Sequence, residues 1–166
     1  MHKNAVAVAE AGQALGLTIE VKEFPEGTRT AADAAAAIGV GVGQIVKSLV
    51  FRVGDPEGAE GEAGGRTVVA YVSGTNQLDE AALASAAGAK AAWRVDAKAV
   101  RTATGFPVGG VPPFGHATAM DVYIDVDLLA YDEVWAAAGT PHHVFAITPA
   151  SLIKASGAIP VPLAKR

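Results

Sequence analysis

The sequence predicts an α+β fold built around a mixed β-sheet. Segments with helical and extended patterns are interspersed along the 166 residues, without a strict strand-helix-strand alternation. About half of the residues are hydrophobic, and a chain of this length can bury a substantial core without disulfides or a structural metal. We therefore expect one domain over residues 1–166, with a core made mainly of Val, Leu, Ile and Ala.

Five segments carry the signals of helices. In the first, apolar residues recur at three- and four-residue intervals, and the others begin at a Thr, Asp or Pro that favours a helix N-terminus. Each of them is followed by glycine, the residue most often found just past a helix end, as at Gly39, Gly88 and Gly105. The predicted helices are Asn4–Leu15, Ala31–Ile38 with Thr30 as its N-cap, Asp79–Ala87, Asp96–Thr104 and Pro149–Ser156.

Eight segments with β-branched or alternating apolar residues predict strands. One of them, Thr67–Ser73, is apolar at successive positions, which predicts a strand buried on both faces. The acidic, glycine-rich residues 54–66 precede it and have little apolar surface to bury, so we expect a flexible loop there. The predicted strands are Ile19–Lys22, Lys47–Val53, Thr67–Ser73, Ala91–Val95, Asp121–Val126, Glu133–Ala137, His143–Thr148 and Ala158–Val161.

Composition and charge exclude several classes of function. The net charge of −4 argues against a protein that coats DNA or RNA through many phosphate contacts. The absence of cysteine excludes thiolate catalysis and cysteine-rich zinc sites. Neither a secretory leader nor an apolar run of membrane-spanning length is present, so we expect a cytoplasmic protein without membrane contact. A local basic cluster consists of Lys90, Arg94, Lys98 and Arg101. Such a cluster is typical of a solvated helix face, and the alternative interpretation is a small phosphate-contacting patch.

The segment Gly105–His116 contains four glycines and three prolines in twelve residues. No regular helix or strand tolerates this composition, so it predicts a stiff, irregular loop that can contact a ligand through its peptide groups. Lys47 begins an otherwise apolar strand and must either reach solvent or enter a polar pocket. The polar turn Val72–Asp79 would lie beside Lys47 if the two strands pair, although its residues also suit capping of the next helix.

Familiar catalytic motifs are absent from the sequence. Gly39–Ser48 superficially resembles a phosphate-binding loop, but Val46 stands where that motif requires glycine before lysine. No Gly-x-Ser-x-Gly or His-Glu-x-x-His pattern occurs. The side chains of adjacent His142 and His143 would diverge on a strand, which argues against a two-histidine metal site. We expect neither a metal nor a cofactor.

Four segments, taken in order, carry a resemblance to a known family: Lys47–Phe51, Val72–Gly74, Gly105–Gly115 and Ala138–Gly139. They resemble the YbaK/EbsC family of aminoacyl-tRNA deacylases, which includes domains inserted in bacterial prolyl-tRNA synthetases. The resemblance implies a mixed, barrel-like sheet flanked by helices. It also implies hydrolysis of the ester that joins a wrong amino acid to tRNA, often proline tRNA, with a prolyl-tRNA synthetase as a potential partner. The resemblance covers nearly the whole chain, from Thr30 to the terminal helix.

The resemblance also implies roles for individual residues. Lys47 corresponds to the family's active lysine, and Gly109 and Gly110 correspond to the loop glycines at the scissile ester. Thr140–His143 departs from the common YbaK-like pattern, and His143 instead resembles the pocket histidine of the synthetase-inserted relatives. The expected substrate-binding residues are Thr30, Ser48, Ser73, Gly74, Pro107, Val108, Gly139 and His143, and His116 is expected to anchor the loop.

The leading hypothesis is a free-standing deacylase in which water attacks an ester that is already activated. Peptide N–H groups of the loop would stabilise the developing oxyanion, and the resemblance suggests assistance from an RNA hydroxyl. Lys47 has an ordinary pKa of about 10.4, which favours phosphate binding or carbonyl polarisation over a role as general base. The alternatives are a non-catalytic RNA- or nucleotide-binding module and a protein-partner module that uses the alanine-rich helices.

Overall fold

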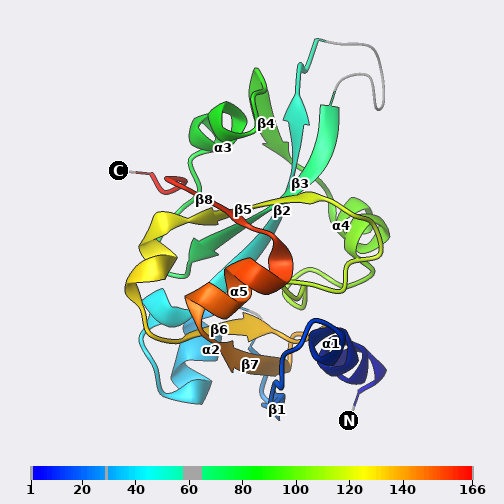
Figure 1. Cartoon of the computed structure of the whole chain (residues 1–166), viewed down its shortest axis with the longest axis vertical. Helices are drawn as coiled ribbons and strands as arrows, with labels where there is room; N and C mark the ends of the chain where they lie inside the picture. Colours follow the sequence, from blue (N-terminus) through cyan, green and yellow to red (C-terminus); the bar gives the residue numbers. More distant parts are fainter. Residues whose placement is uncertain (1, 29, 58–64, 166) are drawn as a thin grey trace.

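Two β-sheets and five α-helices form the part of the chain that the computed structural model describes, residues 2–28, 30–57 and 65–165 (Figure 1). This arrangement confirms the α+β class and the mixed sheet. The barrel-like arrangement is not confirmed, because the two sheets stay separate and no closed barrel forms among these residues. They meet at an isolated parallel bridge between Ile45 and Trp135, beyond which no ladder continues.

The larger sheet has five strands in the order β4-β2-β3-β5-β8. Strand β2 pairs antiparallel with β3 and β4, whereas β3–β5 and β5–β8 are parallel pairs. The central strand β3 is buried from Val68 to Ser73, as its continuous apolar run predicts. The strands are β2 (Val46–Gly54), β3 (Gly65–Ser73), β4 (Ala91–Arg94), β5 (Asp121–Asp125) and β8 (Ile159–Val161).

The smaller sheet is antiparallel and has the order β1-β7-β6, with β1 at Lys22–Glu23, β6 at Val134–Ala137 and β7 at His143–Ile147. The strand expected over Ile19–Lys22 is therefore only partly correct. Ile19 and Val21 pack against the main hydrophobic core instead of extending the ladder. Tertiary packing has overridden the local alternation.

The helices begin and end close to the predicted residues because their capping signals are strong. Thr30 Oγ1 accepts a hydrogen bond from Asp33 N–H, and Asp79 and Asp96 cap their helices in the same way. Figure 1 shows α3 beside β4. The helices are α1 (Lys3–Ala14), α2 (Ala31–Ile38), α3 (Glu80–Ala86), α4 (Ala97–Thr104) and α5 (Pro149–Ser156), with short 3₁₀ helices η1 (Val42–Gln44) and η3 (Val126–Ala130).

The acidic loop predicted over residues 54–66 lies largely outside the described residues. At its two described ends, Gly54 pairs with Gly65 in the β2–β3 ladder. The glycine-rich segment Gly39–Ser48, which resembles a phosphate-binding loop, begins directly after α2 and contains η1. Gly39 adopts a φ of 88° at the end of α2, so these glycines serve as helix end and turn.

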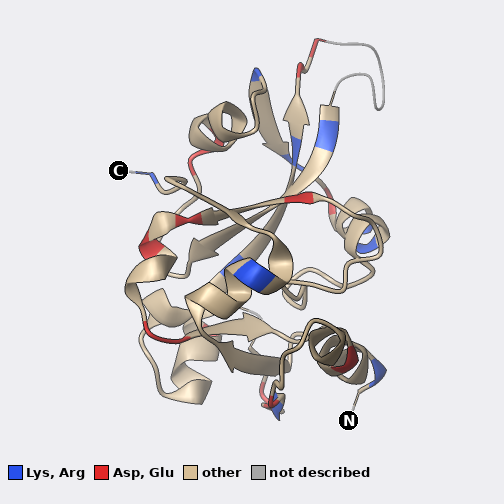
Figure 2. Cartoon of the chain, viewed as in Figure 1, with Lys and Arg blue, Asp and Glu red and all other residues tan. Residues whose placement is uncertain are grey.

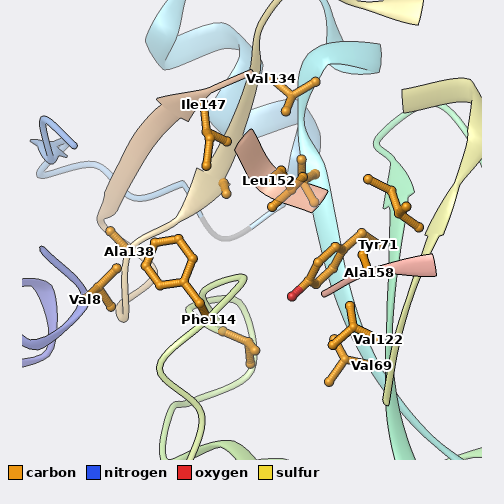
Figure 3. Packing of buried hydrophobic residues seen from close by; sticks show 14 of the residues in the cluster. Val8, Val69, Tyr71, Phe114, Val122, Val134, Ala138, Ile147, Leu152 and Ala158 are labelled. Atoms are coloured by element: carbon orange, nitrogen blue, oxygen red, sulfur yellow. The ribbon is translucent and has the colours of Figure 1, made fainter. Parts of the chain in front are cut away.

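The main hydrophobic core joins the two sheets to the Gly105–Gly115 loop (Figure 3). Tyr71 of β3 is fully buried, and its hydroxyl donates a 2.5 Å hydrogen bond to the Pro113 carbonyl. Burial raises the pKa of Tyr71, so the hydroxyl keeps its proton for this bond. Phe114 of the same loop packs against Phe145 of β7 at a ring separation of 5.7 Å. The loop is thus fixed to both sheets.

The positions of Lys, Arg, Asp and Glu are distributed over several helices, strands and loops, as the ribbon colours show (Figure 2). Within the described ranges, no helix is long and apolar enough to cross a membrane.

Candidate functional site

A cavity of about 410 Å³ lies between the start of β2, the N-terminus of α2, strand β6 and the glycine-rich loop. Two elements that the sequence singles out meet here, Lys47 and the loop at Val108 and Gly109. The cavity, called the Lys47 cavity below, has a volume typical of small-ligand sites. Its lining includes Thr30, Lys47, Ser48, Val108, Gly109 and Trp135.

Lys47 is held at the cavity by the turn that follows β3. Its register partner on β3 is Val72, and its Nζ donates a hydrogen bond to the carbonyl of Asn76. The Asn76 amide in turn donates to Asp127 at 2.8 Å and to Asp125 at 3.3 Å. The expected position of the polar turn beside Lys47 is therefore confirmed. Burial lowers the pKa of Lys47 from its ordinary value of 10.5, and the positive charge of Arg94 lowers it further.

Two orphan polar atoms belong to residues that line the same cavity. In the described part of the chain, three buried side-chain polar atoms have no hydrogen-bond partner, and two of these are Ser48 Oγ and Trp135 Nε1. Burying a polar atom without a partner is costly, and such atoms in native proteins call for a physical reason. Both atoms are buried beneath the cavity wall, so a ligand would reach them only if side chains of the wall moved.

Gly109 and Gly110 are adjacent in the loop, and each position requires glycine for a different structural reason. Gly109 has a φ of 84°, a left-handed conformation that favours glycine. Gly110 lies against the turn after β6, and a Cβ there would stand 2.8 Å from Thr140 N and Cα. The Gly110 carbonyl accepts a 2.9 Å hydrogen bond from Gly139 N–H, while its own N–H donates to the Pro107 carbonyl. Gly110 thus packs the loop against the turn after β6, whereas Gly109 lines the cavity.

Ser73 and Gly74 lie behind the cavity and are absent from its lining. Ser73 is buried, and its Oγ donates a 2.7 Å hydrogen bond to the Gly43 carbonyl. Gly74 N–H donates to Ile45 at 2.8 Å, and a side chain at Gly74 would collide with the Val42 carbonyl. The structure therefore places both residues where they hold η1 against the end of β3.

Three other expected binding residues lie at a second, polar region. Pro107 and His143 line a cavity of about 540 Å³ together with Arg101 and Glu23. Val144 lines the Lys47 cavity, so the preceding strand residue, His143, faces the other side of the smaller sheet. Gly139 packs against α1, and its carbonyl accepts a 2.9 Å hydrogen bond from Asn4 Nδ2. The structure does not bring these three residues into the Lys47 cavity.

His143 is 3 % exposed and is held between two polar groups. Its Nδ1 lies 2.5 Å from Thr140 Oγ1, and its Nε2 lies 3.5 Å from Glu23 Oε2. His142 precedes the strand and lines the same polar cavity. His116 Nε2 lies 2.7 Å from the Pro112 carbonyl, which agrees with its expected role as a loop anchor.

We expect the free energy of unfolding to decrease as the pH falls below 6.5. Burial lowers the pKa of His116 and His143 from the ordinary value of 6.5, and Glu23 only partly opposes this shift at His143. Between the lowered pKa and 6.5 the unfolded chain binds more protons than the folded chain. The contribution of the two neutral histidines to the free energy of unfolding is therefore complete above that range and is lost as the pH falls through it. Urea unfolding across this pH range should give a weaker pH dependence for His116→Gln and His143→Gln than for wild type, and equal dependences would contradict the assignment.

The basic cluster Lys90–Arg101 does not form one surface. Lys90 pairs with Asp55 at 3.2 Å, and the Arg94 guanidinium lies over the Phe51 ring, 5.8 Å from its centroid. Lys98 and Arg101 line different cavities. The cluster as a whole therefore lacks the continuity that a phosphate-contacting patch of four cations requires.

Sequence reasoning missed Trp135, which lines the Lys47 cavity from β6. Its position depends on how the two sheets meet, because the residue that it bridges is Ile45, at the start of the other sheet. The local signal was limited to a large aromatic residue within a short strand in a chain with few aromatic residues.

Comparisons with known proteins show the family of this chain. Residues 25–155 match the family described as the aminoacyl-tRNA editing domain, and the chain belongs to that family. Protein YwhH of Bacillus subtilis (strain 168), itself uncharacterized, is 33% identical over 133 residues, which cover 80% of this chain and 78% of YwhH.

Two solved structures extend the comparison to the whole fold. One, described as a candidate trans-editing enzyme for prolyl tRNA synthetase, is 42% identical, with a TM-score of 0.88 and coverage of 100% of this chain and 99% of that one. The hypothetical protein APE2540 is 28% identical, with a TM-score of 0.84 and coverage of 96% and 99% respectively. Family membership and this similarity support a role in tRNA editing.

Proposed function

We propose that this protein is a free-standing deacylase that hydrolyses mischarged aminoacyl-tRNA, with proline tRNA carrying a small non-cognate amino acid as its substrate. The observation that carries the proposal is the meeting of Lys47 and the fixed glycine-rich loop at one cavity. A partner synthetase and a cytoplasmic location belong to the same proposal. The description of the solved relative, which names prolyl tRNA synthetase, supports proline tRNA as the substrate.

The aminoacyl ester would bind with its carbonyl between Lys47 and the loop. Lys47 supplies positive charge, and among the described residues no hydrogen-bond acceptor is assigned to Gly109 N–H. An uncommitted peptide N–H on a fixed loop can stabilise the oxyanion that forms when water attacks the ester. The Gly110 N–H is already committed to Pro107, which favours a supporting role for Gly110.

Selectivity would come from the size of the cavity. Small side chains form much of its wall, including Ala31, Ala34, Ala136 and Ala137, while the Trp135 ring limits its extent. A small amino acid fits beside a ribose in such a space, and a larger one must displace packed atoms. Packed protein interiors resist such displacement.

A panel of mischarged tRNAs tests the proposed function. Proline tRNA charged with alanine, serine, threonine, cysteine or proline is incubated with the protein, and release of free amino acid is timed. We expect at least one small non-cognate amino acid to be released well above the spontaneous rate, while prolyl-tRNA is spared. Spontaneous rates for every member of the panel would contradict the proposal.

A further inference from the structure

A small recess opens directly beside the Lys47 cavity and carries a second cation, Arg94. The recess has a volume of about 110 Å³, and Arg94 at the end of β4 contributes to its wall. Half of its lining is shared with the Lys47 cavity, so the two spaces are adjoining parts of one surface. The shared residues are Ser48, Leu49, Val108, Gly109 and Val111.

The sheet directs Arg94 and Lys47 to the same face. Lys47, Leu49 and Phe51 alternate along β2 and therefore share a face. Arg94 is the register partner of Phe51, and side chains of directly opposed residues project on one side of an antiparallel pair. The Cα atoms of Lys47 and Phe51 are about 13 Å apart at the usual strand spacing. The two long cationic side chains thus flank the surface above Leu49.

Neither cation has an acidic partner within the described residues. Lys47 Nζ donates to a backbone carbonyl, and Arg94 is exposed and stacks over Phe51. Their mutual repulsion contributes to the lowered pKa of Lys47. An anion bound beside them would relieve this repulsion, and the planar guanidinium fork is suited to two parallel hydrogen bonds with a phosphate.

We propose that Arg94 binds the 5′-phosphate of the terminal nucleotide whose aminoacyl ester occupies the Lys47 cavity. This inference rests on the proposed deacylase function and identifies where the RNA part of the substrate is recognised. In a nucleotide esterified on its ribose, the 5′-phosphate is the anion nearest to the ester, separated from it by the width of one ribose. Leu49, which stands between Lys47 and Phe51 on β2, lines both spaces.

Two minimal substrates separate phosphate recognition from catalysis. One amino acid released in the tRNA panel is esterified to the ribose of adenosine and, in parallel, to that of 5′-adenosine monophosphate. Wild type, Arg94→Met and Arg94→Lys are compared on both esters. Lys98→Met is the matched control, because it removes an exposed cation from the next helix without touching either space.

Wild type is expected to have a higher kcat/KM for the phosphorylated ester than for the adenosine ester. Arg94→Met should lower kcat/KM about 10- to 100-fold for the phosphorylated ester and leave the adenosine ester nearly unchanged, the size expected for hydrogen bonds to a charged group. For the phosphorylated ester, the kcat/KM of Arg94→Lys should lie between those of wild type and Arg94→Met, because lysine keeps the positive charge but lacks the planar guanidinium fork. Lys98→Met should match wild type on both.

Equal losses on both esters in Arg94→Met, or no preference in wild type, would overturn the assignment of Arg94. No release from any tRNA in the panel would instead contradict the deacylase function. In that case equilibrium binding still decides the phosphate assignment. Wild type should bind 5′-adenosine monophosphate more tightly than adenosine, and this difference should disappear in Arg94→Met.

Discussion

Lys47→Ala is expected to lower kcat/KM for amino acid release about 100- to 1,000-fold, the loss typical of removing one preorganised electrostatic group from an active site. Lys47 supplies positive charge at the cavity where the ester carbonyl would bind, and within the described residues its side chain donates a hydrogen bond to the Asn76 carbonyl. Single-turnover hydrolysis of mischarged tRNA measures the change directly.

The effect of Lys47→Ala should be on catalysis and hardly on folding. Lys47 is half-buried and belongs to no ion pair among the described residues, so urea unfolding should give nearly the wild-type free energy. Lys98→Ala, which removes an equal charge from α4, should retain full activity. Equal hydrolysis rates in wild type and Lys47→Ala would show that Lys47 has no catalytic role.

Gly110→Ala is expected to lower the free energy of unfolding by about 1–3 kcal/mol and to reduce hydrolysis strongly. The added methyl group would stand 2.8 Å from the Thr140 backbone, and neither backbone segment can move without breaking the Gly139–Gly110 hydrogen bond. Overpacking a tight contact usually costs this much. Because Gly109 is the next residue, the displaced loop would also misplace the proposed oxyanion donor.

Urea unfolding and hydrolysis assays on Gly110→Ala should both be compared with Gly41→Ala. The nearest atom to a Cβ at Gly41 is Gln44 Oε1 at 3.8 Å, an ordinary contact, and Gly41 has a φ of −71°. Gly41→Ala should therefore behave like wild type. A Gly110→Ala variant that is as stable and as active as Gly41→Ala would rule out close packing as the reason for glycine at this position.

The helices could be predicted from sequence because their signals are local. Thr30, Asp79 and Asp96 cap helices within three residues of themselves, and glycine ends two of those helices in a left-handed conformation at Gly39 and Gly105. The Ile19–Lys22 strand was less predictable because its alternation also suits residues packed against a core. Only the position of β7 decides which of them pair.

The site was predictable where composition was unusual and unpredictable where the fold decided. The loop at Val108 and Gly109 and the cation at Lys47 stand out in the sequence, and the structure brings them together. His143 was harder to place, because a shift of one residue in strand register turns a side chain to the opposite face. Ser73 and Gly74 carry turn signals that do not distinguish a pocket wall from the support behind it.

The attachments of the glycine-rich loop have a consequence for the thermodynamics of binding. Tyr71 holds Pro113, His116 lies against Pro112, and Gly139 holds Gly110, so the segment is already immobilised before any substrate arrives. Its conformational entropy is lost during folding, and the substrate's binding energy is not consumed in ordering it. Such preorganisation leaves more of the interaction energy available for the transition state.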